Sequence, residues 1–294
     1  INKEQFMKLN SCIARKITTL LAANVVLLLS LTPALAAEPL RIGMIPDAGA
    51  TQVSVEEKVP LQKYLEQQLG MPVKLIIPTS YNATLEGLGN GSLDVAYFGG
   101  LTYVKAHARY GAIPLVQRDV DRQFHSLLIT RKSTGIDSLK DLKGKTFCFG
   151  DINSTSGHLF SYLAMKNAGI LPDHDLKSYR YTGSHAATAQ AVATGVCDAG
   201  SLDETVYKSM IADGKIPGNE MKVFFTTPAF ADYVWAARKD LPRDLEQKFS
   251  NAMLRLEPGH DDKILGILRA KHFVVANNDE YSEVERVAKE LGLM

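Results

Sequence analysis

The sequence has little of several features that would indicate a function at once. Among its 294 residues are only three cysteines, and 33 lysines and arginines almost balance 32 aspartates and glutamates. Three cysteines are too few for a disulfide-stapled scaffold or for a zinc site with four thiolate ligands. The formal net charge of +1 leaves no excess of cations, so nucleic acid is not expected as a partner. Because 46% of the residues are hydrophobic, a globular fold of one large or two medium domains is expected.

Motifs for catalysis and for cofactor binding are also lacking. The sequence contains no G-x-S-x-G elbow, no H-E-x-x-H pair and no two histidines at metal-ligand spacing. The stretch from Gly150 to Gly157 has the wrong spacing for a phosphate-binding P-loop and lacks the Lys-Ser/Thr pair that would follow it. Glycines 87, 89 and 91 precede a strand instead of following one, so they are interpreted as a turn. No enzyme activity, metal or cofactor is therefore expected.

The first 36 residues have the organisation of a secretory signal peptide. Basic residues at positions 8, 15 and 16 precede an almost uncharged stretch from Ile17 to Leu35, which ends in Ala34-Leu35-Ala36. A basic start, a short apolar run and small residues at the cleavage site are typical of export signals. The alternative is a membrane anchor, but Asn24 and Pro33 interrupt the run and make it a poor bilayer span. Cleavage after Ala36 and a periplasmic location are expected.

Two cysteines, Cys148 and Cys197, remain after that cleavage, in a compartment that permits disulfides. Both lie in apolar, strand-like stretches, where buried free cysteine is common. Free thiols are therefore favoured, with a disulfide as the alternative.

The rest of the chain alternates strands with helices. Strands are expected at residues 40–45, 73–77, 93–98, 145–149, 178–181 and 196–200. Helices are expected at residues 59–69, 81–88, 101–110, 157–168 and 186–194. This rhythm is typical of parallel sheets with covered faces, and it restarts once, so it predicts two α/β units.

Two further stretches, 125–131 and 233–238, are interpreted as strands that cross between the units. The expected fold is α/β, with two lobes joined by two crossing strands. Lobe 1 would comprise residues 37–124 plus 239–294, and lobe 2 residues 125–238 including the hinge strands. Loops from the strand ends would then converge on a ligand cleft between the lobes.

The most informative stretch is the segment from Gly150 to Gly157, which we call the hydroxyl loop. It follows a strand, precedes a helix and contains three consecutive hydroxyl residues, Ser154, Thr155 and Ser156. The N–H groups of a first helical turn lack partners within the helix, and the helix dipole favours an anion there. Capping alone needs one such residue. The sequence therefore predicts an oxyanion site with neutral donors.

Other candidates lie where strands end. His185 opens a helix after a strand and is interpreted as a donor to an anionic oxygen, although a lone histidine is more often structural. Asp203 and Glu204 follow one another at a strand end, so only one of them is expected to face the cleft; a solvated pair that caps the next helix is the alternative. Among the aromatic residues, Tyr81 and Tyr233 are favoured as hydroxyl donors. Three more residues complete the candidate set: Tyr97, Phe124 and His125.

These stretches resemble the periplasmic substrate-binding proteins of phosphonate and phosphite ABC transporters. The specific part is the Ser-Thr-Ser-Gly loop at 154–157 with the later Gly-Ser-His at 183–185. Further matching stretches cover nearly all of the exported chain, at residues 79–81, 85–88, 93–99, 124–129, 141–145 and 233–238. The resemblance implies the type II periplasmic-binding-protein fold, with two lobes that close on a ligand and perform no chemistry.

Residue by residue, the resemblance implies that a defined set of side chains binds the oxyanion: Tyr81, Ser154, Thr155, Ser156 and His185. Where binders of aminoalkylphosphonates use carboxylates for the ligand amine, this chain departs from them. One acid is replaced around Tyr233, although Asp232 is adjacent, and the other maps loosely to Asp203, Glu204 or Thr205. A binding-site tyrosine is also Phe124 here.

The implied function is capture of phosphite or a short phosphonate for an ABC importer. A monomer that docks on the transporter permease is expected. The alternatives are a 2-aminoethylphosphonate binder and a sensory protein that reports an oxyanion to a membrane histidine kinase.

Overall fold

The computed structural model describes residues 38–46 and 55–294, together with residue 2. The expected signal peptide therefore lies outside the described residues, apart from that single position. The fold belongs to one compact unit, Pro39–Met294. No helix in the described part of the chain is both long enough and apolar enough to cross a membrane.

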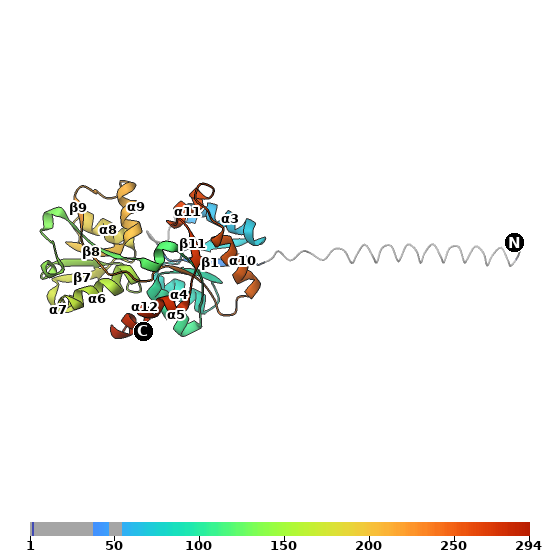
Figure 1. Ribbon diagram of the computed structural model, residues 1–294, viewed down its shortest axis with the longest axis horizontal. Coiled ribbons are helices and arrows are strands. Elements are labelled where there is room, and N and C mark those ends of the chain that lie inside the picture. The colour runs from blue at the N-terminus through green and yellow to red at the C-terminus, as the bar shows by residue number, and fades with distance from the viewer. Residues whose placement is uncertain (1, 3–37, 47–54) are drawn as a thin grey trace. The chain divides into compact units, whose positions relative to one another are not determined.

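A six-stranded sheet with the order β11-β4-β10-β3-β1-β2 forms the first lobe (Figure 1). Its strands are β1 Leu40–Met44, β2 Val73–Ile76, β3 Val95–Phe98, β4 Ile113–Arg118, β10 Val234–Ala237 and β11 Phe273–Val275. Strands β1, β2 and β3 are parallel, whereas β10 runs antiparallel to both of its neighbours. The helices of this lobe are α3 Val59–Leu69, α4 Tyr81–Gly89, α5 Gly100–Tyr110, α10 Arg243–Leu254, α11 Asp262–Leu268 and α12 Ser282–Glu290.

A five-stranded sheet with the order β7-β6-β8-β5-β9 forms the second lobe. Its strands are β5 Ser126–Arg131, β6 Thr146–Phe149, β7 Ser178–Tyr181, β8 Ala199–Asp203 and β9 Met221–Thr226. Its helices are α6 Phe160–Asn167, α7 Pro172–Asp175, α8 His185–Ala193 and α9 Glu204–Ala212. Two sheets with covering helices confirm the predicted α/β fold.

Local sequence explains why several elements begin and end where expected. Helix α3 has a proline in its first turn and ends at Gly70, whose φ of 66° is in the left-handed region that glycine adopts without strain. It buries Leu61, Leu65 and Leu69, which are spaced four residues apart and therefore lie on one face. The bounds predicted for this helix are confirmed.

The second crossing differs from the sequence expectation. Residues 233–238 were interpreted as a hinge strand of lobe 2, but β10 lies inside the first sheet, between β3 and β4. The reason is burial: all four side chains of β10, Trp235 among them, are fully inaccessible to solvent, and only an interior strand is covered on both faces. The two segments that connect the lobes meet instead at an antiparallel bridge between Phe124 and Phe230. The backbone groups of these two residues exchange hydrogen bonds of 2.9 and 3.0 Å.

Strand β8 carries two corrections to the sequence expectations. It begins at Ala199 and extends to Asp203, whereas the expected strand was 196–200. The preference for free thiols was also wrong, because Cys148 of β6 and Cys197, just before β8, form a disulfide with a Cα–Cα distance of 5.9 Å. The pairing of β6 with β8 brings the two cysteines together.

Candidate functional site

The hydroxyl loop leads into a π-helical turn, Thr155–Leu159, that precedes α6. The Ser154 carbonyl accepts from the Leu159 N–H at 3.1 Å, five residues on. The Ser154 hydroxyl accepts from the Gly157 N–H at 2.9 Å and so caps the turn. Single π-helical turns are rare and occur frequently at functional sites, since they widen the first turn of a helix.

Gly157 lets the hydroxyl loop pack against the next element of the site. A Cβ at this position would lie 2.9 Å from the Ser154 hydroxyl, 3.1 Å from the Cα of Gly150 and 3.2 Å from the ring of His185. The carbonyl of Gly157 accepts from the N–H of Gly150 and from the hydroxyl of Ser201, both at 2.8 Å. The hydroxyl loop and His185 are therefore neighbours, as predicted.

The three consecutive hydroxyls have different partners. Ser154 is the cap just described. Thr155 accepts from the N–H of Leu101 at 3.0 Å and so caps α5, a helix of the first lobe. The hydroxyl of Ser156 is buried and has no hydrogen-bond partner in the part of the chain that the structure describes. Ser156 is thus the one hydroxyl of the three that has no partner among the described residues, so both its donor and its acceptor capacity remain for a ligand.

His185 brings together tyrosines from distant parts of the chain. Its Nε2 lies 3.2 Å from the hydroxyl of Tyr81 and 2.9 Å from that of Tyr233. Its Nδ1 accepts from the backbone N–H of Asp203 at 3.2 Å. Because Nδ1 accepts, the neutral ring carries its proton on Nε2, which faces the two phenols. We call Tyr81, Ser156, His185, Asp203 and Tyr233 the inner site.

Asp203 and Glu204 point to different surroundings. Oδ1 of Asp203 caps α9 by accepting from the N–H groups of Thr205 and Val206, whereas its buried Oδ2 has no partner among the described residues. Burial by itself would raise the pKa of Asp203, but the neighbouring His185 and arginines lower it below the ordinary value. Glu204 instead pairs with Lys208, one turn along α9, at 2.7 Å. The structure therefore does not bring Glu204 into the inner site.

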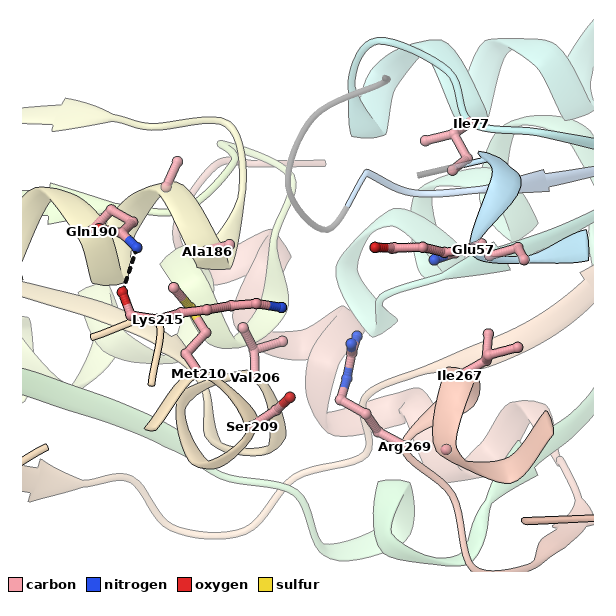
Figure 2. Close-up of a pocket in the computed structure, with 13 residues that line it drawn as sticks. Glu57, Ile77, Ala186, Gln190, Val206, Ser209, Met210, Lys215, Ile267 and Arg269 are labelled. Carbon is pink, nitrogen blue, oxygen red and sulfur yellow. Dashed lines mark hydrogen bonds between the residues drawn. The ribbon is translucent and has the colours of Figure 1, made fainter. Parts of the chain in front are cut away.

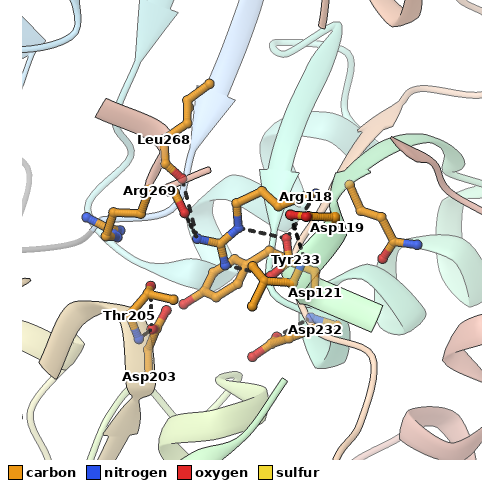
Figure 3. A network of polar contacts seen from close by, with 12 residues as sticks. Arg118, Asp119, Asp121, Asp203, Thr205, Asp232, Tyr233, Leu268 and Arg269 are labelled. Atoms are coloured by element: carbon orange, nitrogen blue, oxygen red, sulfur yellow. Dashed lines mark hydrogen bonds and ion pairs between the residues drawn. The ribbon is translucent and has the colours of Figure 1, made fainter. Parts of the chain in front are cut away.

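A buried ion pair that the sequence analysis missed supports Tyr233 from behind (Figure 3). Arg118 is only 1% exposed, and its guanidinium donates to both oxygens of Asp121 at 2.6 and 2.8 Å. The same guanidinium lies 4.9 Å from the ring centroid of Tyr233, a cation–π contact. Burial raises the pKa of Asp121 to about 6, against the opposing effect of Arg118. The available signal was an arginine and an aspartate three residues apart at the end of a strand.

Asp232 is a second buried carboxylate that the sequence analysis mentioned only as a neighbour of Tyr233. The backbone N–H of Gly100 donates to its Oδ1 at 3.0 Å, and the hydroxyl of Thr155 bonds to the same carboxylate. Burial raises the pKa of Asp232 to about 7 despite these hydrogen bonds. This acid therefore lies where the hydroxyl loop meets α5.

The remaining candidates surround the inner site without entering it. Tyr97 stacks on Tyr233 with ring centroids 5.2 Å apart, and Phe124 packs edge-on against the same ring at 5.7 Å. His125 lies beside the bridge between the lobes, where its Nδ1 is 2.8 Å from the carbonyl of Thr227. These residues shape the wall and the hinge.

The hydroxyl loop also binds the first lobe directly. Asn153 accepts at its side chain from Lys105 Nζ at 2.6 Å and at its carbonyl from the Thr102 hydroxyl at 3.0 Å, both on α5. Asp151 accepts from the backbone N–H of Tyr81, at the start of α4. The loop therefore caps two helices of the opposite lobe, while its Gly157, next to Ser156, packs against His185.

The donors of the inner site suit an oxyanion. The hydroxyls of Tyr81 and Tyr233 converge on Nε2 of His185, and the hydroxyl of Ser156 lies in the adjoining loop without a partner among the described residues. None of these groups carries a fixed charge. Within the part of the chain that the structure describes, no group of three or more His, Cys, Asp or Glu side chains is placed to hold a metal ion. The site is thus built for binding through hydrogen bonds.

Comparison with known proteins agrees with this geometry. Residues 42–281 match the family described as ABC transporter, phosphonate, periplasmic substrate-binding protein. The chain is 31% identical over 267 residues to the probable ABC transporter phosphite binding protein PhnD1 of Prochlorococcus marinus (strain MIT 9301). That alignment covers 86% of this chain and 89% of PhnD1. It is 30% identical over 224 residues to the phosphate-import protein PhnD of Mycolicibacterium smegmatis, with 72% of this chain and 70% of that protein covered.

The solved structure of PhnD1 from Prochlorococcus marinus (MIT 9301), in complex with methylphosphonate, has a TM-score of 0.81 to this protein at 30% identity. The alignment covers 87% of this chain and 98% of that chain, so both lobes and the hinge are included. The chain therefore belongs to the family of periplasmic substrate-binding proteins of phosphonate ABC transporters and has the type II periplasmic-binding-protein fold.

Proposed function

We propose that this protein captures phosphite or a short phosphonate and delivers it to an ABC importer. The observation that carries the proposal is the convergence of neutral donors on His185, with the phenols of Tyr81 and Tyr233 at 3.2 and 2.9 Å from its Nε2. Relatives whose names specify phosphite binding and a complex with methylphosphonate support this ligand class.

The ligand oxygens would bind at the π-helical turn and then be enclosed by the lobes. Ser156 and His185 belong to the second lobe, whereas Tyr81 begins α4 of the first. Closing the lobes therefore completes the set of donors around the ligand. A charge-assisted hydrogen bond contributes about 1.5–3 kcal/mol, so each donor accounts for roughly one to two decades of affinity.

The carboxylates favour a singly protonated oxyanion over an amine-bearing ligand. Oδ2 of Asp203 is buried beside His185 and is available to accept a hydrogen bond from the O–H of a singly protonated ligand. Glu204, the alternative partner for an ammonium group, is occupied by Lys208 outside the inner site. We therefore favour phosphite or methylphosphonate over 2-aminoethylphosphonate.

The remaining parts of the proposal concern the setting of the protein. Its family consists of transport components, and we propose binding without turnover of the ligand. We also propose that the segment 1–36 directs export and is removed, and that the exported chain acts as a monomer. Its partner would be the permease of the transporter, in preference to a sensor kinase.

Isothermal titration against phosphite, methylphosphonate, 2-aminoethylphosphonate and phosphate tests the proposal. Phosphite or methylphosphonate should bind most tightly, and Ser156→Ala should weaken that binding by about 10- to 100-fold. Ser138→Ala is a matched control, because Ser138 is exposed and bonds to Asp141 far from the inner site. Preference for the amine-bearing ligand, or unchanged affinity in a folded Ser156→Ala protein, would refute the proposal.

A further inference from the structure

A cleft of about 690 Å³ lies next to the inner site and is larger than phosphite or methylphosphonate requires. Residues at or next to α3 and α11 line it from the first lobe, and residues at or next to α8 and α9 from the second (Figure 2). We call it the outer cleft and define it by six of its lining residues: Lys58, Ile77, Val206, Met210, Lys215 and Arg269.

The outer cleft combines an apolar wall with an excess of positive charge. Among the described residues that line it are three cations, Lys58, Lys215 and Arg269, and one carboxylate, that of Glu57. Figure 2 shows the charged ends of Lys215 and Arg269 directed into the space between the lobes. Lys58 is only 8% exposed and forms no ion pair with a carboxylate in the described ranges, whereas Lys215 pairs with Asp213 at 3.1 Å.

Arg269 is held in an unusual backbone conformation at the edge of this cleft. It is the C-cap of α11 and has a φ of 50°, the only positive φ of a non-glycine residue in the described part of the chain. The buried guanidinium of Arg118 donates to the carbonyls of Leu268 and Arg269 at 3.4 and 3.3 Å (Figure 3). Residues held in such sparsely populated conformations cluster at ligand-binding positions.

The outer cleft continues from the inner site along the same helices. Ala186 and Ala187, which line the cleft, directly follow His185 at the start of α8. Val206 lines it from α9, and its N–H donates to Asp203 at 2.9 Å. Arg269 also reaches the inner site electrostatically, as one of the basic neighbours that lower the pKa of Asp203 after burial has raised it.

From this geometry we infer that the outer cleft binds the organic substituent of a phosphonate whose short aliphatic chain ends in a carboxylate. The phosphonate group would occupy the inner site, the chain would contact Val206 and Met210, and Arg269 with Lys58 would bind the distal carboxylate. The inference rests on the proposed function, since the inner site must hold the phosphonate group.

Three ligands that differ only at the end of a two-carbon chain test this inference by isothermal titration: 3-phosphonopropionate, propylphosphonate and 2-aminoethylphosphonate. The carboxylate-ended ligand should bind at least about 10-fold more tightly than the neutral one, and the ammonium-ended ligand should bind most weakly. Arg269→Asn should remove most of that 10-fold advantage. Asparagine is chosen because it tolerates the positive φ of this position.

Lys58→Met provides a second variant that leaves the backbone of α11 unaltered, and it should also lower the advantage of 3-phosphonopropionate. Arg286→Gln is the control, since Arg286 carries the same charge on the exposed face of α12. Equal affinity for 3-phosphonopropionate and propylphosphonate, with methylphosphonate still bound, would overturn the inference alone. Failure of both phosphite and methylphosphonate to bind would overturn the proposed function as well.

Discussion

At the scale of single residues, the inner site depends on how one histidine is oriented. The N–H of Asp203 occupies Nδ1 of His185, so Nε2 faces the phenols of Tyr81 and Tyr233. The buried Arg118 lies over the ring of Tyr233 and holds that ring in place from the opposite side. The His185 ring is thus oriented by a backbone N–H and the Tyr233 ring by a buried charge, so these side chains need little reorganisation when a ligand binds.

Tyr233→Phe tests the contribution of one phenol. The variant keeps the ring that stacks on Tyr97 but loses the hydroxyl beside His185, so affinity for phosphite or methylphosphonate should fall about 10-fold in an isothermal titration. Tyr179→Phe is the control, because the Tyr179 hydroxyl bonds to Asp173 on the protein surface. Equal losses in the two variants would show that the Tyr233 hydroxyl does not contact the ligand.

Asp232 should make the stability of the protein depend on pH. Its pKa is raised from 3.8 to about 7, mainly by burial, so the folded state binds this proton more tightly than the unfolded state. The resulting stabilisation is complete below about pH 4 and is lost as the pH rises to about 7. The corresponding free energy is about 4 kcal/mol.

Asp232→Asn should remove this dependence, because an amide does not titrate. Compared with the unaltered protein, the variant should gain relative stability between about pH 4 and pH 7 and show a constant difference above that range. Denaturant unfolding at a series of pH values measures this difference. Other titrating groups, such as Asp121, are present in both proteins, so they largely cancel. A difference that does not vary with pH would contradict the assignment.

At the scale of secondary-structure elements, the π-helical turn Thr155–Leu159 is the feature that separates the roles of the three hydroxyls. An ordinary α-helical start would use Ser154 as its cap and continue with the usual spacing. In the wider turn, the Thr155 hydroxyl accepts from the Leu101 N–H of α5, in the other lobe. The Ser156 hydroxyl is buried without a partner among the described residues. The element therefore combines a contact between the lobes with the proposed ligand contact in one segment.

Gly157→Ala should disrupt this turn. The new methyl group would lie 2.9 Å from the Ser154 hydroxyl and 3.1 Å from the Cα of Gly150. Overpacking of this kind costs about 1–3 kcal/mol, which denaturant unfolding can measure, and ligand affinity should fall as His185 is displaced. Gly266→Ala in α11 is the control: a Cβ there meets no atom within 4 Å, so its stability should be unchanged or slightly higher. Equal stability of both variants would show that the turn tolerates a side chain.

At the scale of the whole molecule, closure of the lobes depends on hydrogen bonds that cross between them away from the ligand. Lys105 of α5 donates to Asn153 of the hydroxyl loop at 2.6 Å. Lys105 is only 8% exposed. Burial lowers the pKa of Lys105. We therefore expect ligand affinity to depend on this contact outside the inner site.

Lys105→Met should favour the open arrangement, because it keeps the aliphatic stem and loses the bond to Asn153. Affinities for phosphite and methylphosphonate should then fall by the same factor, about 10-fold, as isothermal titration can show. Lys248→Met is the control, since Lys248 is exposed and pairs with Asp244 within α10 of the first lobe. A change in the ratio of the two affinities would instead indicate direct contact with the ligand.

Much of the fold was predictable because its signals are local. The apolar spacing of α3, its terminal glycine and the strand–helix rhythm depend on residues close together in the chain, and they indicate two α/β units. The crossing at 233–238 was assigned to the wrong sheet because membership of a strand depends on burial by distant segments. The disulfide likewise depends on which strands pair.

The sequence by itself determined the α/β class, the position of the hydroxyl loop between a strand and a helix, and the placing of Tyr81, His185 and Tyr233 at the ends of strands or the starts of helices. Only the tertiary structure decided that these side chains meet, that Thr155 caps a helix of the other lobe, and that Glu204 pairs outside the inner site. It also showed Arg118 and Asp121 buried behind Tyr233. The physical reason is that capping and strand periodicity act over a few residues, whereas tertiary packing joins residues far apart in the chain, such as Tyr81 with His185 and Arg118 with Tyr233.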